Sequence, residues 1–291
     1  MTKLIANDII KKTDAVRRVL VYEVTMKYGM PTLLECRDIF ECCDAALKYK
    51  LDFVEINTSF PDYKPSAVSV DRLRKKAEEC SLFFTIHADE SLNPLDLDDR
   101  VSACYTEIMR ETIEFAKAIS ARVINMHLLR GIYVTLPDRV VELNDVYLEK
   151  YLEKTRQFIQ MCEKTIRDAD IKISIENVDS NSFTLAQKRA IELFLKSPVF
   201  ALTLDTGHEL MLGYRDTEVF LRYPDRIHHL HLHDSDGKSA HLPLGKGTVK
   251  ISEKLSSLSS GDTVLIEVKN LDGLRESIEY LKKENLWKTG D

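Results

Sequence analysis

Short apolar runs alternate with longer amphipathic segments along nearly the whole chain. The apolar runs have the length of strands, whereas the segments between them repeat apolar residues close to every 3.6 positions, as helices do. Eight runs fit strands, at residues 19–26, 53–60, 82–89, 122–129, 171–178, 200–208, 227–234 and 263–270. Helices are expected between them, including residues 33–49, 98–120, 146–169 and 271–287.

Repeated strand–helix units predict a parallel sheet. Eight units in 291 residues are what a closed (β/α)8 TIM barrel needs, and the glycine-rich phosphate turn of a doubly wound open sheet is missing from the sequence. We therefore predict an α/β fold in which residues 18–291 form a single barrel domain and residues 1–17 an N-terminal arm or helix. Residues 131–144 form a long loop after the fourth strand, in a position to cover a site.

Composition narrows the class of protein. The chain has a formal net charge of -6, which argues against nucleic acid as a partner. No segment has the roughly 18 apolar residues of a membrane span, and the N-terminus lacks a signal-peptide pattern, so we expect a cytoplasmic protein with no membrane partner. The six cysteines are expected to be reduced and buried. The oligomeric state is not determined by the sequence, and a homo-oligomer is one possibility.

Polar side chains occupy one face of the expected strands, and aliphatic side chains the other. In residues 171–178, Ile173 and Ile175 share one parity, whereas Ser174 and Glu176 share the opposite one. The same inner parity, late in each strand, holds a further acidic or imidazole group in five other strands: His87, His127, Asp205, His231 and Glu267. Active sites of barrels lie at the C-terminal ends of the strands, so these groups should converge there.

Converging carboxylates indicate a cation. A buried carboxylate is costly unless it is paired or bound to a metal. A mixture of Glu, Asp and His suits Mn, Co, Zn, Fe or Mg better than Ca. We therefore predict a divalent metal at the mouth of the barrel.

Six motifs in order carry a family resemblance from the second strand to the last helix. They are TIHADESLN from Thr85, INMH from Ile124, ISIEN from Ile173, LDTGH from Leu204, HLHDSDGKSAHLPLGKG from His231 and LIEVK from Leu265. With them the chain resembles the xylose-isomerase-like barrel superfamily. That superfamily includes sugar and sugar-phosphate isomerases and epimerases as well as endonuclease IV.

The resemblance implies a metal site and an activity. A central metal would be held by Glu176, Asp205, His231 and Glu267, and the two glutamates would also be the catalytic acid/base pair. The implied function is a divalent-metal-dependent isomerase or epimerase of a sugar or sugar phosphate, which moves a proton through an enediolate.

Further residues leave the number of metal ions open between one and three. The resemblance to endonuclease IV, which holds three zinc ions, adds His87, His127, His208 and His241 to the ligand set. Ser239 stands where that family has an aspartate, and the nearby Asp236 could replace it. His208 would bind substrate or a further metal. Lys246, where the family commonly has glutamate, is either a ligand for a substrate phosphate or carboxylate or a solvated loop lysine.

Three other functions stay open on the same scaffold. They are a dehydratase (lyase) that acts on a keto-inositol or keto-sugar, a zinc hydrolase at abasic DNA, and a barrel that binds sugar without catalysis. Glu23 and Glu55, inward on the first two strands, are expected to support the site by hydrogen bonding rather than to bind metal.

Overall fold

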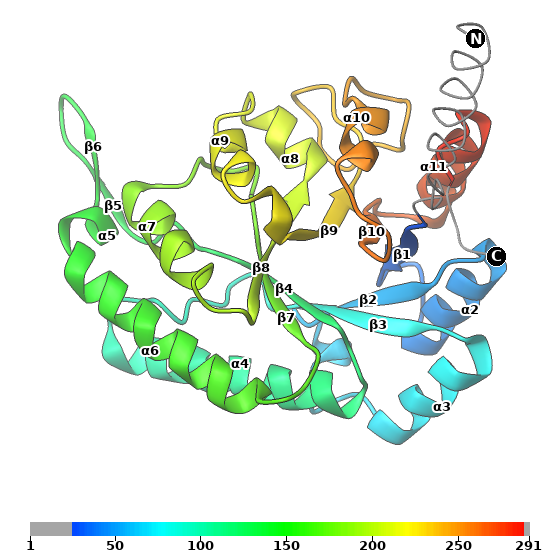
Figure 1. The fold of residues 1–291 in the computed structure, drawn as a ribbon, viewed down its shortest axis with the longest axis horizontal. Coiled ribbons are helices and arrows are strands. Elements are labelled where there is room, and N and C mark those ends of the chain that lie inside the picture. Colours follow the sequence, from blue (N-terminus) through cyan, green and yellow to red (C-terminus); the bar gives the residue numbers. More distant parts are fainter. Residues whose placement is uncertain (1–24, 288–291) are drawn as a thin grey trace, which may run out of the picture.

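Eight parallel strands close into a barrel in the computed structural model, which describes residues 25–287 (Figure 1). The strands follow one another around the barrel in chain order, and the first pairs with the last to close it. They are β1 (Lys27–Pro31), β2 (Phe53–Asn57), β3 (Phe83–His87), β4 (Val123–His127), β7 (Lys172–Glu176), β8 (Phe200–Asp205), β9 (Ile227–Leu232) and β10 (Thr263–Ile266). The predicted TIM barrel is thus confirmed.

Helices connect the strands and cover the outside of the barrel. The longer ones are α2 (Ile39–Tyr49), α3 (Val70–Cys80), α4 (Asp99–Ala118), α6 (Leu148–Ile166), α7 (Leu185–Phe194) and α11 (Leu271–Lys283). Short ones are α5 (Leu143–Val146), α8 (Thr206–Met211), α9 (Thr217–Leu221), α10 (Ile251–Ser256), and the 3-10 turns η1 (Pro61–Tyr63) and η2 (Pro224–Arg226). The helix predicted at 33–49 begins only at Ile39, because the Asp38 side chain caps it by accepting the Glu41 N–H.

The strands have the predicted inner and outer rows. On the outer row of β8, Phe200 packs against Phe194 of α7 and Phe158 of α6. On the inner row, Thr203 donates a hydrogen bond to the Ser174 hydroxyl on the neighbouring strand at 2.6 Å. The hydrophobic core therefore lies between strands and helices, and the barrel interior is free to hold polar groups.

The predicted position of the first strand is wrong. Residues 1–24, with the N-terminal arm, most of the expected strand and Glu23, lie outside the described residues, and Thr25 and Met26 precede β1. The strand is KYGMP, a sequence that resembles a turn. Gly29 is required because a Cβ there would lie 2.3 Å from the ring of Phe53 on β2.

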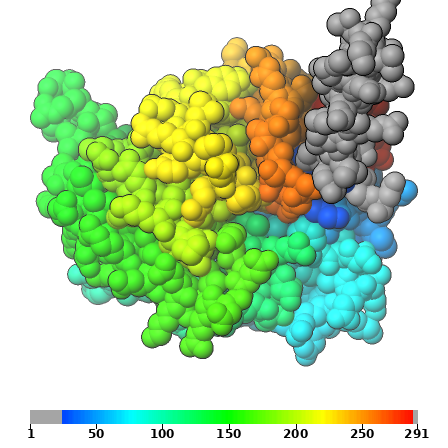
Figure 2. All heavy atoms as spheres, in the orientation of Figure 1, coloured from blue at the N-terminus to red at the C-terminus, as the bar shows by residue number. Residues whose placement is uncertain are grey.

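Residues 131–144 are not a plain loop. They contain a two-stranded antiparallel hairpin of β5 (Tyr133–Thr135) and β6 (Val140–Glu142). The hairpin stands out from the rest of the surface in Figures 1 and 2.

Two expectations from composition can be compared with the structure. All six cysteines are free, and five are buried, but Cys104 is exposed on α4, so the expectation of burial is wrong for that residue. Within residues 25–287, no helix has the length and apolar character needed to cross a bilayer.

Candidate metal centre

The strand ends bring the predicted site residues to one mouth of the barrel. His87, His127, Glu176 and Asp205 are the last residues of β3, β4, β7 and β8. His231 lies near the end of β9, and Glu267 follows β10 directly. Strand register sets two of the pairs side by side, His127 with Glu176 and Asp205 with His231.

Three carboxylates converge on the His231 imidazole. Its Nδ1 lies 2.9 Å from Glu267 Oε2, 3.0 Å from Glu176 Oε1 and 4.0 Å from Asp205 Oδ2. One potential ligand atom from each of the four lies within 4.8 Å of the others. Glu176 is 1% exposed, Asp205 and His231 are fully buried, and Glu267 is 9% exposed. The arrangement is the right size for one ion.

Buried polar atoms at this point lack hydrogen-bond partners. His231 Nδ1 and Glu267 Oε2 face each other, but neither makes an aligned hydrogen bond to any residue in the part of the chain described. Buried nitrogen and oxygen atoms are almost always paired. A divalent cation would satisfy both, and a donor set of two glutamates, one aspartate and one histidine suits Mn, Fe, Co, Zn or Mg. The residues present therefore fit a metal.

Glu55 faces the Nε2 atom of His231, whereas Glu176 and Glu267 face its Nδ1 atom. The Glu55 carboxylate is 3.2 Å from His231 Nε2 and 3.1 Å from His229 Nε2, and it accepts a hydrogen bond from Thr85 Oγ1. Burial raises the Glu55 pKa, but the two imidazoles lower it more, to well below its usual range. Glu55 is therefore placed to orient the His231 ring, as expected of a supporting carboxylate.

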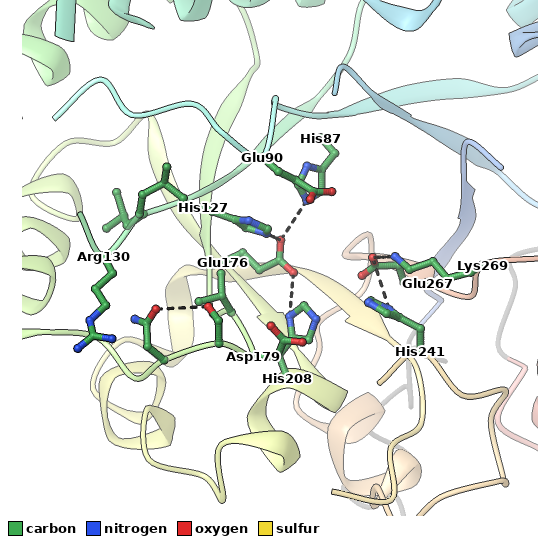
Figure 3. A pocket seen from close by; sticks show the side chains of 15 residues that line it. His87, Glu90, His127, Arg130, Glu176, Asp179, His208, His241, Glu267 and Lys269 are labelled. Carbon is green, nitrogen blue, oxygen red and sulfur yellow. Dashed lines mark hydrogen bonds and ion pairs between the residues drawn. The ribbon is translucent and has the colours of Figure 1, made fainter. Parts of the chain in front are cut away.

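Two histidines and an amide hold the outer oxygen of Glu176. His127 Nε2 lies 3.1 Å and His87 Nε2 3.4 Å from Glu176 Oε2, and the Asn125 amide donates to the same atom. Figure 3 shows both rings directed at this carboxylate. Burial lowers the His87 pKa, but Glu176 outweighs that effect and the pKa is about 9. Burial likewise raises the Glu176 pKa, and His231 and His127 bring it well below its usual range.

Three more histidines gather beside Asp205. The His208 main chain donates to Asp205 Oδ1 at 2.7 Å, and its Nδ1 lies 3.5 Å from Oδ2. His233 Nε2 lies 2.9 Å from Asp205 Oδ1, while His233 Nδ1 accepts the His241 main-chain N–H at 2.8 Å. His241 Nδ1 is 3.7 Å from Glu267 and has no hydrogen bond to a residue in the described range. Burial lowers the His241 pKa to about 4, so this ring is neutral at pH 7.

Ser239 stands where the endonuclease IV family has an aspartate, and Asp236 does not take the place of that aspartate. Asp236 is exposed, and its carboxylate accepts the main-chain N–H groups of Lys238 and Ser239 within its own loop. The third member of the histidine cluster is instead His233.

A pocket of about 500 Å³ opens over these groups (Figure 3). Its walls include Glu90, Leu128, Leu129, Arg130, Val178, Asp179, Ser180, Asn181 and Lys269, besides the metal-site candidates His87, His127, Glu176, His208, His241 and Glu267. The described part of the hairpin segment 131–144 contributes no side chain to this lining, so the expectation that it covers the site is wrong.

Lys246 does not reach the pocket. Its side chain is 59% exposed, and its ammonium lies 3.3 Å from Glu276 on α11. Of the two alternatives for this residue, the geometry favours the solvated loop lysine.

Sequence reasoning missed Asn125 and Lys269. Asn125 shares the inner row with His127, and Lys269 follows Glu267 by two residues, so alternation was the available signal. Lys269 Nζ lies 2.9 Å from Glu267 Oε1, and Figure 3 shows it and His241 on either side of that carboxylate. Burial raises the Glu267 pKa, but the nearby His231 and Lys269 bring it well below its usual range.

Known proteins share the sequence pattern and the fold of this chain. The sequence profile of the xylose isomerase-like TIM barrel family matches residues 43–284. The chain belongs to this family. Within the xylose isomerase-like barrels, the uncharacterized protein MJ1311 of Methanocaldococcus jannaschii is 24% identical over 270 residues, which cover 89% of each chain.

Two solved structures illustrate the shared fold. A D-tagatose 3-epimerase-like protein superposes with a TM-score of 0.72 and 23% identity, covering 90% of this chain and 98% of that one. The IolI protein with a bound zinc atom superposes with a TM-score of 0.66 and 16% identity, covering 90% and 97%. At these identities the likeness establishes the barrel, and function depends on the site itself.

Proposed function

We propose that this protein is a divalent-metal-dependent sugar isomerase or epimerase that transfers a proton through an enediolate. The observation that carries the proposal is that ligand atoms of Glu176, Asp205, His231 and Glu267 lie within 4.8 Å of one another, and that two of these residues, Glu176 and Glu267, line the pocket. The names of two solved structures with the same fold, a D-tagatose 3-epimerase-like protein and a zinc-bound IolI, support the substrate class and the metal.

The four residues would hold the metal as three carboxylates and one imidazole. When bound, the ion would polarise a substrate carbonyl or hydroxyl and so acidify the neighbouring C–H bond. Glu55 lies 3.2 Å from His231 Nε2, and the His208 main chain and His233 fix the orientation of Asp205. The chain thereby keeps its own donors in position before any ligand arrives.

Glu176 and Glu267 are placed to move the proton. They come from different walls of the pocket, at the ends of β7 and β10, and each approaches His231 Nδ1, at 3.0 and 2.9 Å. Their lowered pKa values keep both ionised at neutral pH, as a general base requires. One carboxylate would remove the proton from the carbon beside a carbonyl. The other, after taking up a proton from water, would deliver it to the opposite face of that carbon or to the next carbon, and the first would then release its proton to water.

The test is deuterium exchange in D2O. Mn-loaded protein should incorporate deuterium at a single carbon of at least one sugar in a panel of ketoses and aldoses, followed by NMR. Glu267→Gln should lower the rate by about 10²–10⁴-fold, the range for loss of a general acid or base. Glu276→Gln, on the outer face of α11 beside Lys246, is the matched control and should exchange like the parent. Absence of exchange in every sugar would refute the proposal.

A hydrolase of the endonuclease IV kind is the second candidate. The observation in its favour is the additional cluster of His87, His127 and Glu176, which could hold a further ion. The missing aspartate at Ser239 and the net charge of -6 weigh against it. Nicking of an abasic duplex by zinc-loaded protein, together with two or three zinc ions per chain, would favour this alternative.

A further inference from the structure

The cations of the pocket are already neutralised by the protein. Arg130 and Lys269 are the two Lys or Arg residues among the described residues that line it. The Arg130 guanidinium makes a forked pair with Glu142, whose two oxygens are each 3.0 Å from Nε. Lys269 pairs with Glu267 at 2.9 Å. Neither cation is therefore available to pair with an anionic group of a substrate.

A side chain of the protein itself occupies the place where barrels most often bind phosphate. That place is formed by the loops after the seventh and eighth strands, and β9 is the seventh strand here. The loop after β9 contains the glycine-rich turn LPLGKG, but its main-chain N–H groups bind Asp234. Asp234 is 1% exposed and accepts from Ser235, Gly245, Gly247 and Val249, all at 2.8–2.9 Å.

This internal carboxylate fits its turn closely. A Cβ at Gly247 would lie 2.4 Å from Asp234 Oδ1, so the turn has no spare room around the carboxylate. Such a set of converging N–H groups is a typical anion site. With Asp234 in it, and with Lys246 paired outside to Glu276, the turn offers nothing to a substrate phosphate.

Apart from His87, which lies 3.4 Å from Glu176, the remaining charged groups of the pocket wall are acidic. Glu90 and Asp179 are exposed side chains on the wall. Neither forms an ion pair within residues 25–287, and Glu90 accepts a hydrogen bond from the Asn57 amide at 3.3 Å. With a divalent ion bound, the four wall carboxylates of Glu90, Glu176, Asp179 and Glu267 match the positive charges of the ion, Arg130 and Lys269, so the wall offers an anion no excess of positive charge. Free carboxylates accept hydrogen bonds from hydroxyl groups well and repel phosphates.

We propose that the substrate is an uncharged sugar, that Glu90 and Asp179 accept hydrogen bonds from its hydroxyls, and that sugar phosphates and sugar acids are excluded. This inference rests on the proposed function of the same site, because it names the substrate class on which that chemistry would act.

The experiment uses matched pairs of ligands. D-fructose, D-tagatose and D-xylulose are compared with their terminal phosphates for binding to Mn-loaded protein by calorimetry and for deuterium exchange by NMR. We expect at least one free sugar to bind at least tenfold more tightly than its phosphate. Tighter binding of any phosphate than of its parent sugar would overturn the inference, as would failure of every free sugar to bind. Binding of free sugars without exchange would support the inference and refute the proposed function.

A variant tests the role of the neutralised arginine. Glu142→Gln removes the partner of Arg130 without touching the metal site, so the affinity for a sugar phosphate should rise at least fivefold relative to the free sugar. Glu153→Gln breaks a comparable but exposed pair with Arg156 on α6 and is the control. An unchanged ratio in Glu142→Gln would overturn the assignment of Arg130 as a neutralised anion site.

Discussion

Gly207 determines where the imidazole of His233 can lie. A Cβ at residue 207 would be 2.0 Å from His233 Cε1, a distance that no packing arrangement tolerates. His233 in turn holds Asp205, with Nε2 at 2.9 Å from Oδ1. We expect Gly207→Ala to displace the ring and to weaken Mn binding by about 10–100-fold, as loss of a supporting hydrogen bond to a metal ligand does. Calorimetric titration with Mn measures this change.

A double variant separates this route from general damage. If the alanine methyl acts only by displacing His233, then Gly207→Ala combined with His233→Ala should bind Mn about as well as His233→Ala alone. Additive losses in the double variant would show that Gly207 acts by another route.

At the residue scale, strand alternation alone predicts much of the site. The positions of His87, His127, Glu176 and Asp205 at strand ends follow from the period of two and from the common mouth of a parallel barrel. The rule also places His233 on the inner row with His231, but it does not predict the contact of His233 with Asp205. That contact depends on the empty space at Gly207, which is visible only when β8 and β9 are side by side.

The segment after β9 is an element organised by one side chain. Four main-chain N–H groups point to the buried Asp234 carboxylate, and the turn carries His241 into the pocket. In Asp234→Asn, the amide NH2 group of the new side chain faces main-chain N–H groups of the turn, so donors oppose donors. Each unsatisfied buried group costs about 1–3 kcal/mol. We expect the free energy of unfolding in urea to fall by at least about 3 kcal/mol.

Asp236→Asn is the control for that prediction. Asp236 also accepts two main-chain N–H groups, from Lys238 and Ser239, but it is exposed. Water can replace its bonds, so the loss should stay below about 1 kcal/mol. Equal losses in the two variants would contradict the organising role of Asp234.

Element prediction from sequence succeeded for buried strands and failed where packing overrides composition. Seven strands were placed because each has an aliphatic row that alternates with a second row along a short segment. β1 was placed too early because Gly29 and Pro31 look like a turn, and only the ring of Phe53 explains the glycine. The hairpin of β5 and β6 was missed because its strands have three residues each, too few for a periodic signal.

The stability of the whole molecule depends on which positive charges neutralise the carboxylates at the mouth of the barrel. Without metal, the converging carboxylates are compensated by protonated imidazoles. Burial lowers the His231 pKa, but the surrounding carboxylates raise it well above its usual value, and the His87 pKa rises to about 9. A raised histidine pKa stabilises the fold fully below its unfolded value of about 6.5. That contribution disappears as pH rises through the folded pKa. The metal-free protein should therefore lose stability between about pH 6.5 and about pH 9.

Metal binding has the opposite pH dependence, because an ion must displace the proton on His231. Affinity for Mn should be at least tenfold higher at pH 8 than at pH 6. At 100 times Kd, binding stabilises the fold by about 2.7 kcal/mol, or roughly 5 °C in Tm. The Tm increase on adding Mn, measured by scanning calorimetry at fixed concentration, should thus be larger at pH 8. Glu176→Gln should abolish most of it at both pH values. If the Tm increase on adding Mn were equal or larger at pH 6, protonated imidazoles would not compete with the metal for the carboxylates.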